Sequence, residues 1–140
     1  MNKVSFIFLS LVFLLTACQP TSSNAISLEE VLSSFEEQEL PLKESKLSDK
    51  NIFGMRLNRV RPSGYELGGK ILAVYIYDST KEREKGLEKF YDKTASANVE
   101  SYNYYEVKNV LLFYVHRLNL GLEGEVHEDI QKVVTELEEN

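Results

Sequence analysis

The stretch that decides the fold is residues 70–77, KILAVYIY. Successive side chains of an extended chain point to opposite faces. One face of this stretch carries Leu72, Val74 and Ile76, and the other carries Ile71, Ala73, Tyr75 and Tyr77. Because both faces are largely apolar, the pattern predicts a strand at the centre of a sheet.

The residues before this strand predict its partners. Gly68-Gly69 separates residues 65–67 from the central strand, and such a two-residue link is typical of a β-hairpin. Residues 52–57 (IFGMRL) alternate Phe53, Met55 and Leu57 on one side, which predicts a further strand. The polar residues 42–49 are expected to hold a short edge strand.

Two more strands are predicted nearer the C-terminus. They cover residues 100–106 and 110–116, with a turn or a bulge at residues 107–109. A final helix is predicted from about Gly124 to Glu139. Its apolar residues follow helical spacing and form one buried stripe: Val126, Ile130, Val133, Val134 and Leu137.

Two earlier helices are indicated by their caps. Ser27 and Ser79 each precede a glutamate by three residues, which is the spacing of a capping box. The first helix must end before Pro41, because a proline pushes the preceding residue out of the α region. The second is expected to reach about Ala95. Their predicted core residues are Leu28, Val31, Leu32 and Phe35 in the first, and Leu87, Phe90, Tyr91, Thr94 and Ala95 in the second.

Gly86 lies inside the second predicted helix. A glycine there costs about 1 kcal/mol relative to alanine, so its presence predicts a close contact between helix and sheet.

The element order is α-(β)-β-β-β-α-β-β-α. Helices alternate with hairpins and not with single strands, which favours an antiparallel sheet over a doubly wound parallel one. The sequence therefore predicts an α+β fold: an antiparallel sheet of four to five strands with three helices packed mainly on one face. The predicted organisation is a signal peptide at residues 1–17, a lipidated cysteine and flexible tether at 18–27, and one domain at 28–140.

The N-terminal segment carries a targeting pattern. Lys3 gives a positive start, residues 4–15 are an apolar run too short to span a bilayer, and small residues then lead to a cysteine. The ending Leu15-Thr16-Ala17-Cys18 resembles the lipobox of bacterial lipoproteins. The resemblance implies a thioether-linked diacylglyceryl group on Cys18 (a palmitate-type lipid anchor) and cleavage just before it.

Such an anchor implies a lipoprotein on the extracytoplasmic face of the cell membrane, bound through the acyl chains on Cys18. Two acyl chains give stable anchoring without a transmembrane helix. Cys18 is the single cysteine of the chain, so its lipidation leaves no thiol for a disulfide, a thiolate metal site or cysteine catalysis. The polar tether predicts a reach of about 15–20 Å from the membrane.

Composition narrows the partners. The chain has 16 Lys and Arg against 22 Asp and Glu, a net charge of −6. Nucleic-acid binding needs clustered basic residues, so no nucleic-acid partner is expected. No cofactor is expected either, because no glycine-rich phosphate loop is present and Gly68-Gly69 belongs to a hairpin.

Three segments extend the resemblance beyond the lipobox: residues 51–58 (NIFGMRLN), 75–87 (YIYDSTKEREKGL) and 105–115 (YEVKNVLLFYV). They are similar to the small uncharacterised lipoproteins of Gram-positive bacteria of the bacillus type. That family has no established activity, so the resemblance implies a location and no site residues.

Tyrosines form the first candidate binding surface. Tyr75 and Tyr77 share one strand face, and Tyr102 and Tyr104 share another. If the two faces coincide, four phenols line one sheet surface. Such a surface is either a recognition platform for a sugar or a peptide, or a ladder of cross-strand pairs that stabilises the sheet.

Arginines form the second candidate binding surface. Arg56, Arg59 and Arg61 cluster before Pro62 in an otherwise acidic domain. Arginine side chains bind carboxylates and phosphates in a bidentate manner, so the cluster is a candidate site for an acidic partner. The alternative is that these arginines pair with the domain's own carboxylates.

Histidine chemistry is sparse. His116 and His127 are the only histidines, and no metal-ligand spacing such as His-Glu-x-x-His is present, so no metal site is predicted. No Gly-x-Ser-x-Gly elbow is present. No catalytic residues are therefore assigned.

Two functions remain open at this point. The first is a small membrane-anchored binding or interaction module without catalysis, with an envelope protein as its partner. It predicts an exposed apolar or aromatic patch. The alternative is a small cell-envelope hydrolase or transferase with an unrecognised site. It predicts a deep pocket that contains His116 or a glutamate with a strongly perturbed pKa.

Overall fold

The computed structural model describes residues 24–116 and 123–140, so the predicted signal peptide and Cys18 lie outside the described residues. The elements are α1 (Leu28–Glu37), β1 (Lys43–Glu44), the 3-10 helix η1 (Ile52–Gly54), β2 (Ser63–Leu67), β3 (Lys70–Ile76), α2 (Thr80–Thr94), β4 (Tyr102–Val107), β5 (Val110–Val115) and α3 (Glu123–Glu139). The five strands form one antiparallel sheet in the order β1-β2-β3-β5-β4. The predicted α+β class is confirmed, and β3 is the central strand.

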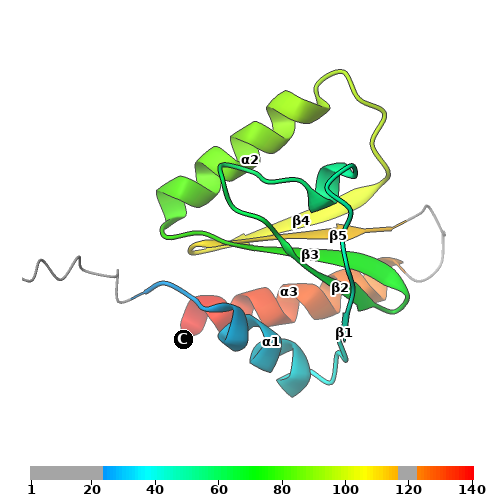
Figure 1. The fold of residues 1–140 in the computed structure, drawn as a ribbon. Helices are drawn as coiled ribbons and strands as arrows, with labels where there is room; N and C mark the ends of the chain where they lie inside the picture. The colour runs from blue at the N-terminus through cyan, green and yellow to red at the C-terminus, as the bar shows by residue number, and fades with distance from the viewer. Residues whose placement is uncertain (1–23, 117–122) are drawn as a thin grey trace, which may run out of the picture.

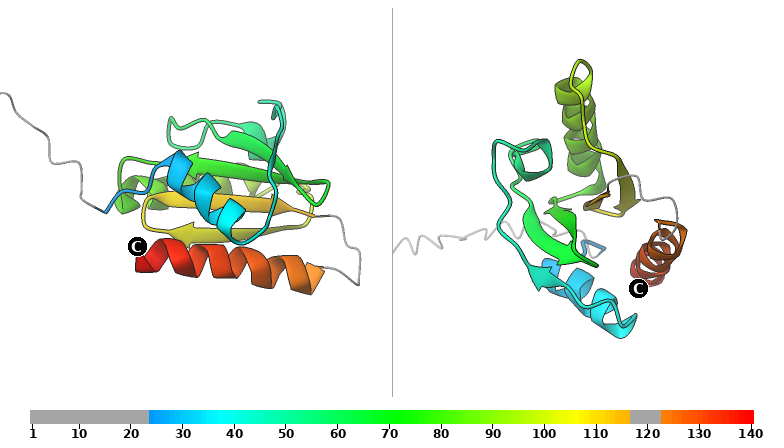
Figure 2. Two further views of the ribbon diagram at one scale, coloured as in Figure 1. Left: turned by 90° about the horizontal axis from the view of Figure 1, so that it is seen from below. Right: turned by 90° about the vertical axis from the view of Figure 1, so that its right-hand side faces the viewer.

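The helices cover both faces of the sheet (Figures 1 and 2). Helices α1 and α3 lie side by side on one face, where Phe35 and Ile130 pack with Leu72 and other residues of the sheet. Helix α2 and η1 cover the other face, where Phe53 and Phe90 are buried. Two of the three helices thus share a face, and the third lies opposite.

Both predicted hairpins are present. Gly68 and Gly69 have φ of 58° and 75°, the left-handed conformation that a tight hairpin turn needs and that glycine adopts without strain. This turn sets Leu67 opposite Lys70. The second turn places Val107 opposite Val110, with Lys108 at φ 47°.

The helix starts follow the predicted caps. The Ser27 hydroxyl accepts from the Glu30 N–H at 3.2 Å, and the Glu30 carboxylate accepts from the Ser27 N–H at 2.7 Å, so this capping box is complete. Ser79 accepts from the Glu82 N–H at 3.2 Å. The Glu82 carboxylate is held by residues outside the cap, as described below.

Gly86 confirms its predicted role. A Cβ atom at this position would overlap the phenol of Tyr77, so only glycine lets α2 come this close to the end of β3. The contact fixes the rotation of α2 about its axis. Leu87 is half-buried, whereas Tyr91 and Ala95, which were predicted to be core residues, face solvent.

The predicted strand at residues 52–57 is wrong. Residues Ile52–Gly54 form η1, and Leu57 pairs only with Val60 in an isolated bridge. The Asn51 side chain accepts from the Phe53 N–H at 2.9 Å and starts the helical turn. Phe53 and Leu57 are still buried, so the apolar pattern predicted their burial correctly but predicted the wrong backbone conformation.

Candidate functional site

A groove of about 590 Å³ lies between the C-terminal half of α1 and the edge strand β1. Its apolar lining comes from Leu32, Leu40, Pro41, Leu42 and Tyr65. Its carboxylates are Glu36, Glu39 and Glu44. The groove therefore combines apolar side chains with three acidic groups, a pairing that the sequence analysis did not single out.

The end of α1 creates this groove. Glu39 adopts a left-handed φ of 56°, and the Leu40 N–H donates to the Phe35 carbonyl at 2.9 Å. This helix-terminating turn sends the chain back toward the sheet. Leu40 and Leu42 are only partly buried against the core, so they offer apolar surface to the groove.

The strand beside the groove has an open edge. Glu44 lies opposite Tyr65 in the β1–β2 ladder, and the next residue, Ser45, donates its N–H to the Gly64 carbonyl at 2.9 Å. In an antiparallel pair, bonded and non-bonded positions alternate. The N–H and C=O of Glu44 therefore point away from β2, toward the outside of the sheet.

The surroundings of the groove are acidic. Helix α1 and residues 124–139 of α3 together hold ten acidic residues and one lysine. The opposite layer, formed by residues 45–62 and α2, holds ten basic and five acidic residues. The net charge of −6 is thus unevenly distributed, and the α1/α3 layer carries the negative potential.

Two titratable groups of this layer have raised pKa values. Burial, followed by the charge of Glu44, raises the pKa of the Tyr65 phenol. A hydrogen bond with Glu136 and the repulsion between the two carboxylates raise the pKa of Glu37, which joins α1 to α3. Both shifts oppose further negative charge on this layer.

Asn109 attaches the residues just before α1 to the sheet. Its side chain is 2% exposed and makes three hydrogen bonds: it accepts from the Ile26 N–H at 2.7 Å and donates to the carbonyls of Ile26 at 2.9 Å and Tyr77 at 2.8 Å. Ile26 is itself buried in the core. Ile26 therefore packs with the folded domain, although the sequence analysis places it within the predicted tether.

The four candidate tyrosines do share one face of the sheet, the face under α2. Tyr75 and Tyr77 stack with ring centroids 6.2 Å apart but are 0% and 2% exposed, so they are core residues and present no platform. Tyr102 is partly buried against the same cluster. Tyr104 is 42% exposed and meets Tyr91 edge-on at 6.4 Å.

The arginine cluster lies on an exposed loop beside α2. The guanidinium of Arg59 is 3.9 Å from the Glu82 carboxylate and 89% exposed, and Arg56 donates to the Arg59 carbonyl at 3.3 Å. Arg61 is exposed. One of the three arginines thus reaches a carboxylate of the domain itself.

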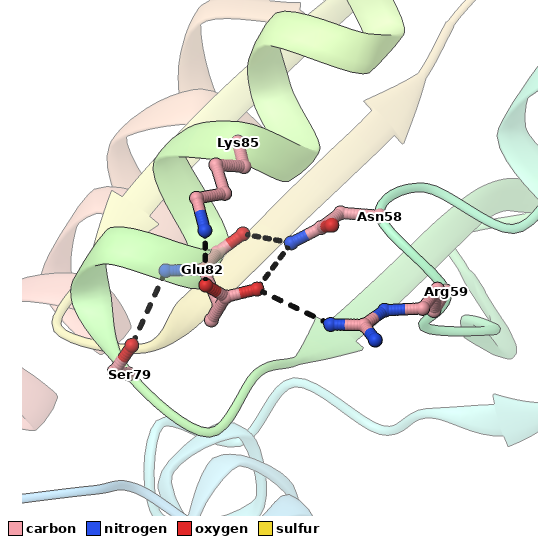
Figure 3. A network of polar contacts seen from close by, with 5 residues as sticks. All are labelled: Asn58, Arg59, Ser79, Glu82 and Lys85. Atoms are coloured by element: carbon pink, nitrogen blue, oxygen red, sulfur yellow. Dashed lines mark hydrogen bonds and ion pairs between the residues drawn. The ribbon is translucent and has the colours of Figure 1, made fainter.

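Figure 3 shows how Glu82 joins this loop to α2. Its carboxylate accepts from Lys85 at 2.6 Å and from the Asn58 amide at 2.8 Å, and Asn58 also donates to the Glu82 carbonyl at 3.0 Å. The hydrogen bond from Lys85, then that from Asn58, lowers the pKa of Glu82. The network positions the loop, so its role is structural.

The two histidines both lie close to Asn103, at one end of the sheet. Asn103 lies between them, 3.4 Å from His116 Nε2 and 3.3 Å from His127 Nδ1. The Tyr105 hydroxyl lies 2.7 Å from the same His127 nitrogen, and burial raises the pKa of this phenol. The cluster gives a buried hydroxyl its hydrogen-bond partner. His127 is exposed, at the border of an open surface depression.

Residues 24–116 and 123–140 also bear on metal binding and on membrane insertion. These residues contain no group of three or more His, Cys, Asp or Glu side chains that could hold a metal ion. In the same part of the chain, every helix is too short or too polar to cross a bilayer.

Comparisons of the chain with protein-family models, curated proteins and solved structures give no match. The groove, the charge distribution and the N-terminal sequence are therefore the features that bear on function.

Proposed function

We propose that this protein is a lipid-anchored interaction module on the extracytoplasmic face of the cell membrane. Cys18 carries the diacylglyceryl anchor, and the groove between α1 and β1 receives a segment of an envelope protein. The observation that carries the binding part is the groove itself, with leucine and tyrosine surface beside three carboxylates. Protein interfaces combine an apolar core that often contains aromatic side chains with a polar rim, and the groove offers both kinds of side chain.

The proposed location rests on the lipobox and on the short distance between Cys18 and the folded domain. Eight residues after Cys18, the chain is held to the fold at Ile26 by Asn109. As a coil, a segment of this length reaches about 15 Å. The domain would therefore work close to the membrane surface, on partners that are themselves membrane-bound or close to it.

Lipidation is tested by metabolic labelling. Cells that express the full chain are grown with a labelled fatty acid, beside cells that express the Cys18→Ala variant. The proposal expects label on the first protein only, and unprocessed precursor for the variant, because no other side chain can form the thioether. Equal labelling of the two proteins would contradict the anchor.

Binding through the groove is tested by site-specific photo-crosslinking in the same cells. A photoreactive residue replaces Leu40 in the groove or, as a control, Asp92 on the exposed side of α2. A discrete crosslinked product from position 40 and none from position 92 supports the interaction module. Equal patterns from both positions would show that the groove is not the docking surface.

A further inference from the structure

We infer that the groove between α1 and β1 binds an extended, basic peptide segment, which adds to the sheet as a strand beside β1. This inference rests on the proposed function and names the chemistry of the partner. It is carried by three features that meet at one place: an open strand edge, an apolar groove beside it, and carboxylates on the groove.

The open edge favours a strand. Glu44 directs both of its backbone groups outward, in the middle of the paired segment that runs from Lys43 to Ser45. An added strand would satisfy these groups with main-chain hydrogen bonds. A helical ligand could not, because its own backbone groups are already paired within the helix.

The side-chain alternation then determines which ligand residues enter the groove. Glu44 and its ladder partner Tyr65 line the groove together, so their side chains are on the α1 side of the sheet. A ligand residue opposite Glu44 would point to the same side. Its neighbours along the ligand would point away, which leaves every second ligand position to be selected by the groove.

The groove is suited to lysine or arginine at those positions. The aliphatic stem of either side chain can lie on Leu32, Leu42 and Tyr65, while the charged end reaches the carboxylates. Glu36 and Glu44 lie on opposite walls, one from α1 and one from β1. The surplus of acidic residues across the α1/α3 layer adds long-range attraction for a basic segment.

The test is a selection of random peptides on the full chain as the cell produces it, held in detergent micelles. Selected peptides are then measured by fluorescence anisotropy against the parent chain, Glu36→Gln and Glu44→Gln. Glu88→Gln, an exposed glutamate on the far face, is the matched control. The expected peptides carry Lys or Arg at alternate positions.

Two further measurements test the strand itself. Each Gln variant in the groove should weaken a selected peptide about two- to fivefold, as expected for partly exposed ion pairs, and the control should leave it unchanged. N-methylation of the peptide residue that pairs with Glu44 should weaken binding about tenfold, because it removes a main-chain donor. Bound peptide should also slow hydrogen exchange of the Glu44 amide.

Several results would overturn the inference. These are selected peptides that are acidic or helical, peptide affinities that are unchanged in both groove variants, or a hydrogen-exchange rate of the Glu44 amide that is unchanged by bound peptide. Each differs from failure of the proposed function, which is judged by crosslinking from position 40 in cells. Crosslinks from position 40 together with helical or acidic peptides would keep the interaction module and reject the strand.

Discussion

Replacing Asn109 with alanine should release the N-terminal attachment and destabilise the fold. The side chain is almost fully buried, and its three hydrogen bonds serve backbone groups of two segments far apart in the chain, at Ile26 and Tyr77. Alanine makes none of them. The Ile26 N–H and the two carbonyls, which belong to buried residues, would then be left without these partners.

The magnitude follows from those three groups. A hydrogen bond contributes about 1 kcal/mol net, and an unpaired buried group costs about 1–3 kcal/mol. The expected loss is therefore about 3–5 kcal/mol, a large part of the roughly 5–15 kcal/mol that stabilises a domain. Asn109→Asp should not rescue it, because a carboxylate cannot donate to the two carbonyls and its charge would be buried.

Urea denaturation gives the free energy of unfolding, and hydrogen exchange follows the Ile26 amide. Asn98→Ala is the control, because Asn98 is exposed and its loss should change stability by less than about 0.5 kcal/mol. The reasoning is refuted if Asn109→Ala costs less than about 1 kcal/mol and the Ile26 amide stays as slow as in the parent chain. Packing of Ile26 alone would then hold the attachment.

Three further predictions concern the helices. Gly86→Ala should destabilise the protein by about 1–2 kcal/mol in thermal unfolding, because the overlap with Tyr77 outweighs the better helix propensity of alanine. In a variant with a smaller residue at position 77, the same substitution should stabilise the protein instead. Tyr77→Phe should leave stability unchanged or raise it by about 1 kcal/mol, since the Tyr77 hydroxyl is buried and has no hydrogen-bond partner among the described residues; a clear loss would reveal such a partner. The raised pKa of Glu37 means that the folded state binds this proton more tightly than the unfolded state does. The resulting contribution to folding stability is present below the ordinary glutamate pKa and is lost as pH rises through the pKa of Glu37 in the folded state. Glu37→Gln should therefore flatten the pH dependence of urea unfolding above about pH 4.5, and an unchanged slope would contradict the pairing with Glu136.

Local chemistry explains what the sequence predicted well. Gly68-Gly69 forms a turn between adjacent residues, and the serine caps accept hydrogen bonds from residues three positions later. These effects do not depend on the rest of the fold. Residues 52–57 show the limit of such reasoning. Their alternation matched a strand, but the Asn51 side chain caps a helical turn, and Gly54 has no Cβ to overlap the nearby Ser48 carbonyl.

The placement of α2 depended on information that the central strands already contained. β3 is apolar on both faces, and all six residues of β5 are buried. A sheet with such strands must be covered on both sides, so one helix had to lie opposite the other two. Because both faces of the sheet are covered, Tyr75 and Tyr77 are core residues. The alternation of side chains along the strand predicted that they share one face, but it did not predict that a helix covers that face.

The groove and Asn109 were beyond prediction for a different reason. The groove exists because Glu39 turns left-handed and returns Leu40 toward β1, and no residue type demands that turn. Asn109 sits where an asparagine is ordinary, in a tight hairpin turn. Its bonds join segments 83 and 32 residues away, and such separations leave no mark on the local sequence.

The position of the groove relative to the proposed anchor supports the two proposals together. Ile26 is attached to Asn109 just before the start of α1, and the groove lies beside the C-terminal half of that helix. A ten-residue helix is about 15 Å long, so the groove would open well away from the attachment point. A basic segment near a membrane is also attracted to anionic lipid, by about 1 kcal/mol for each lysine or arginine, but only within a Debye length of about 8–10 Å. Beyond that distance the proposed acidic groove would have no competitor of this kind, and the surplus of carboxylates in the α1/α3 layer would favour a basic partner.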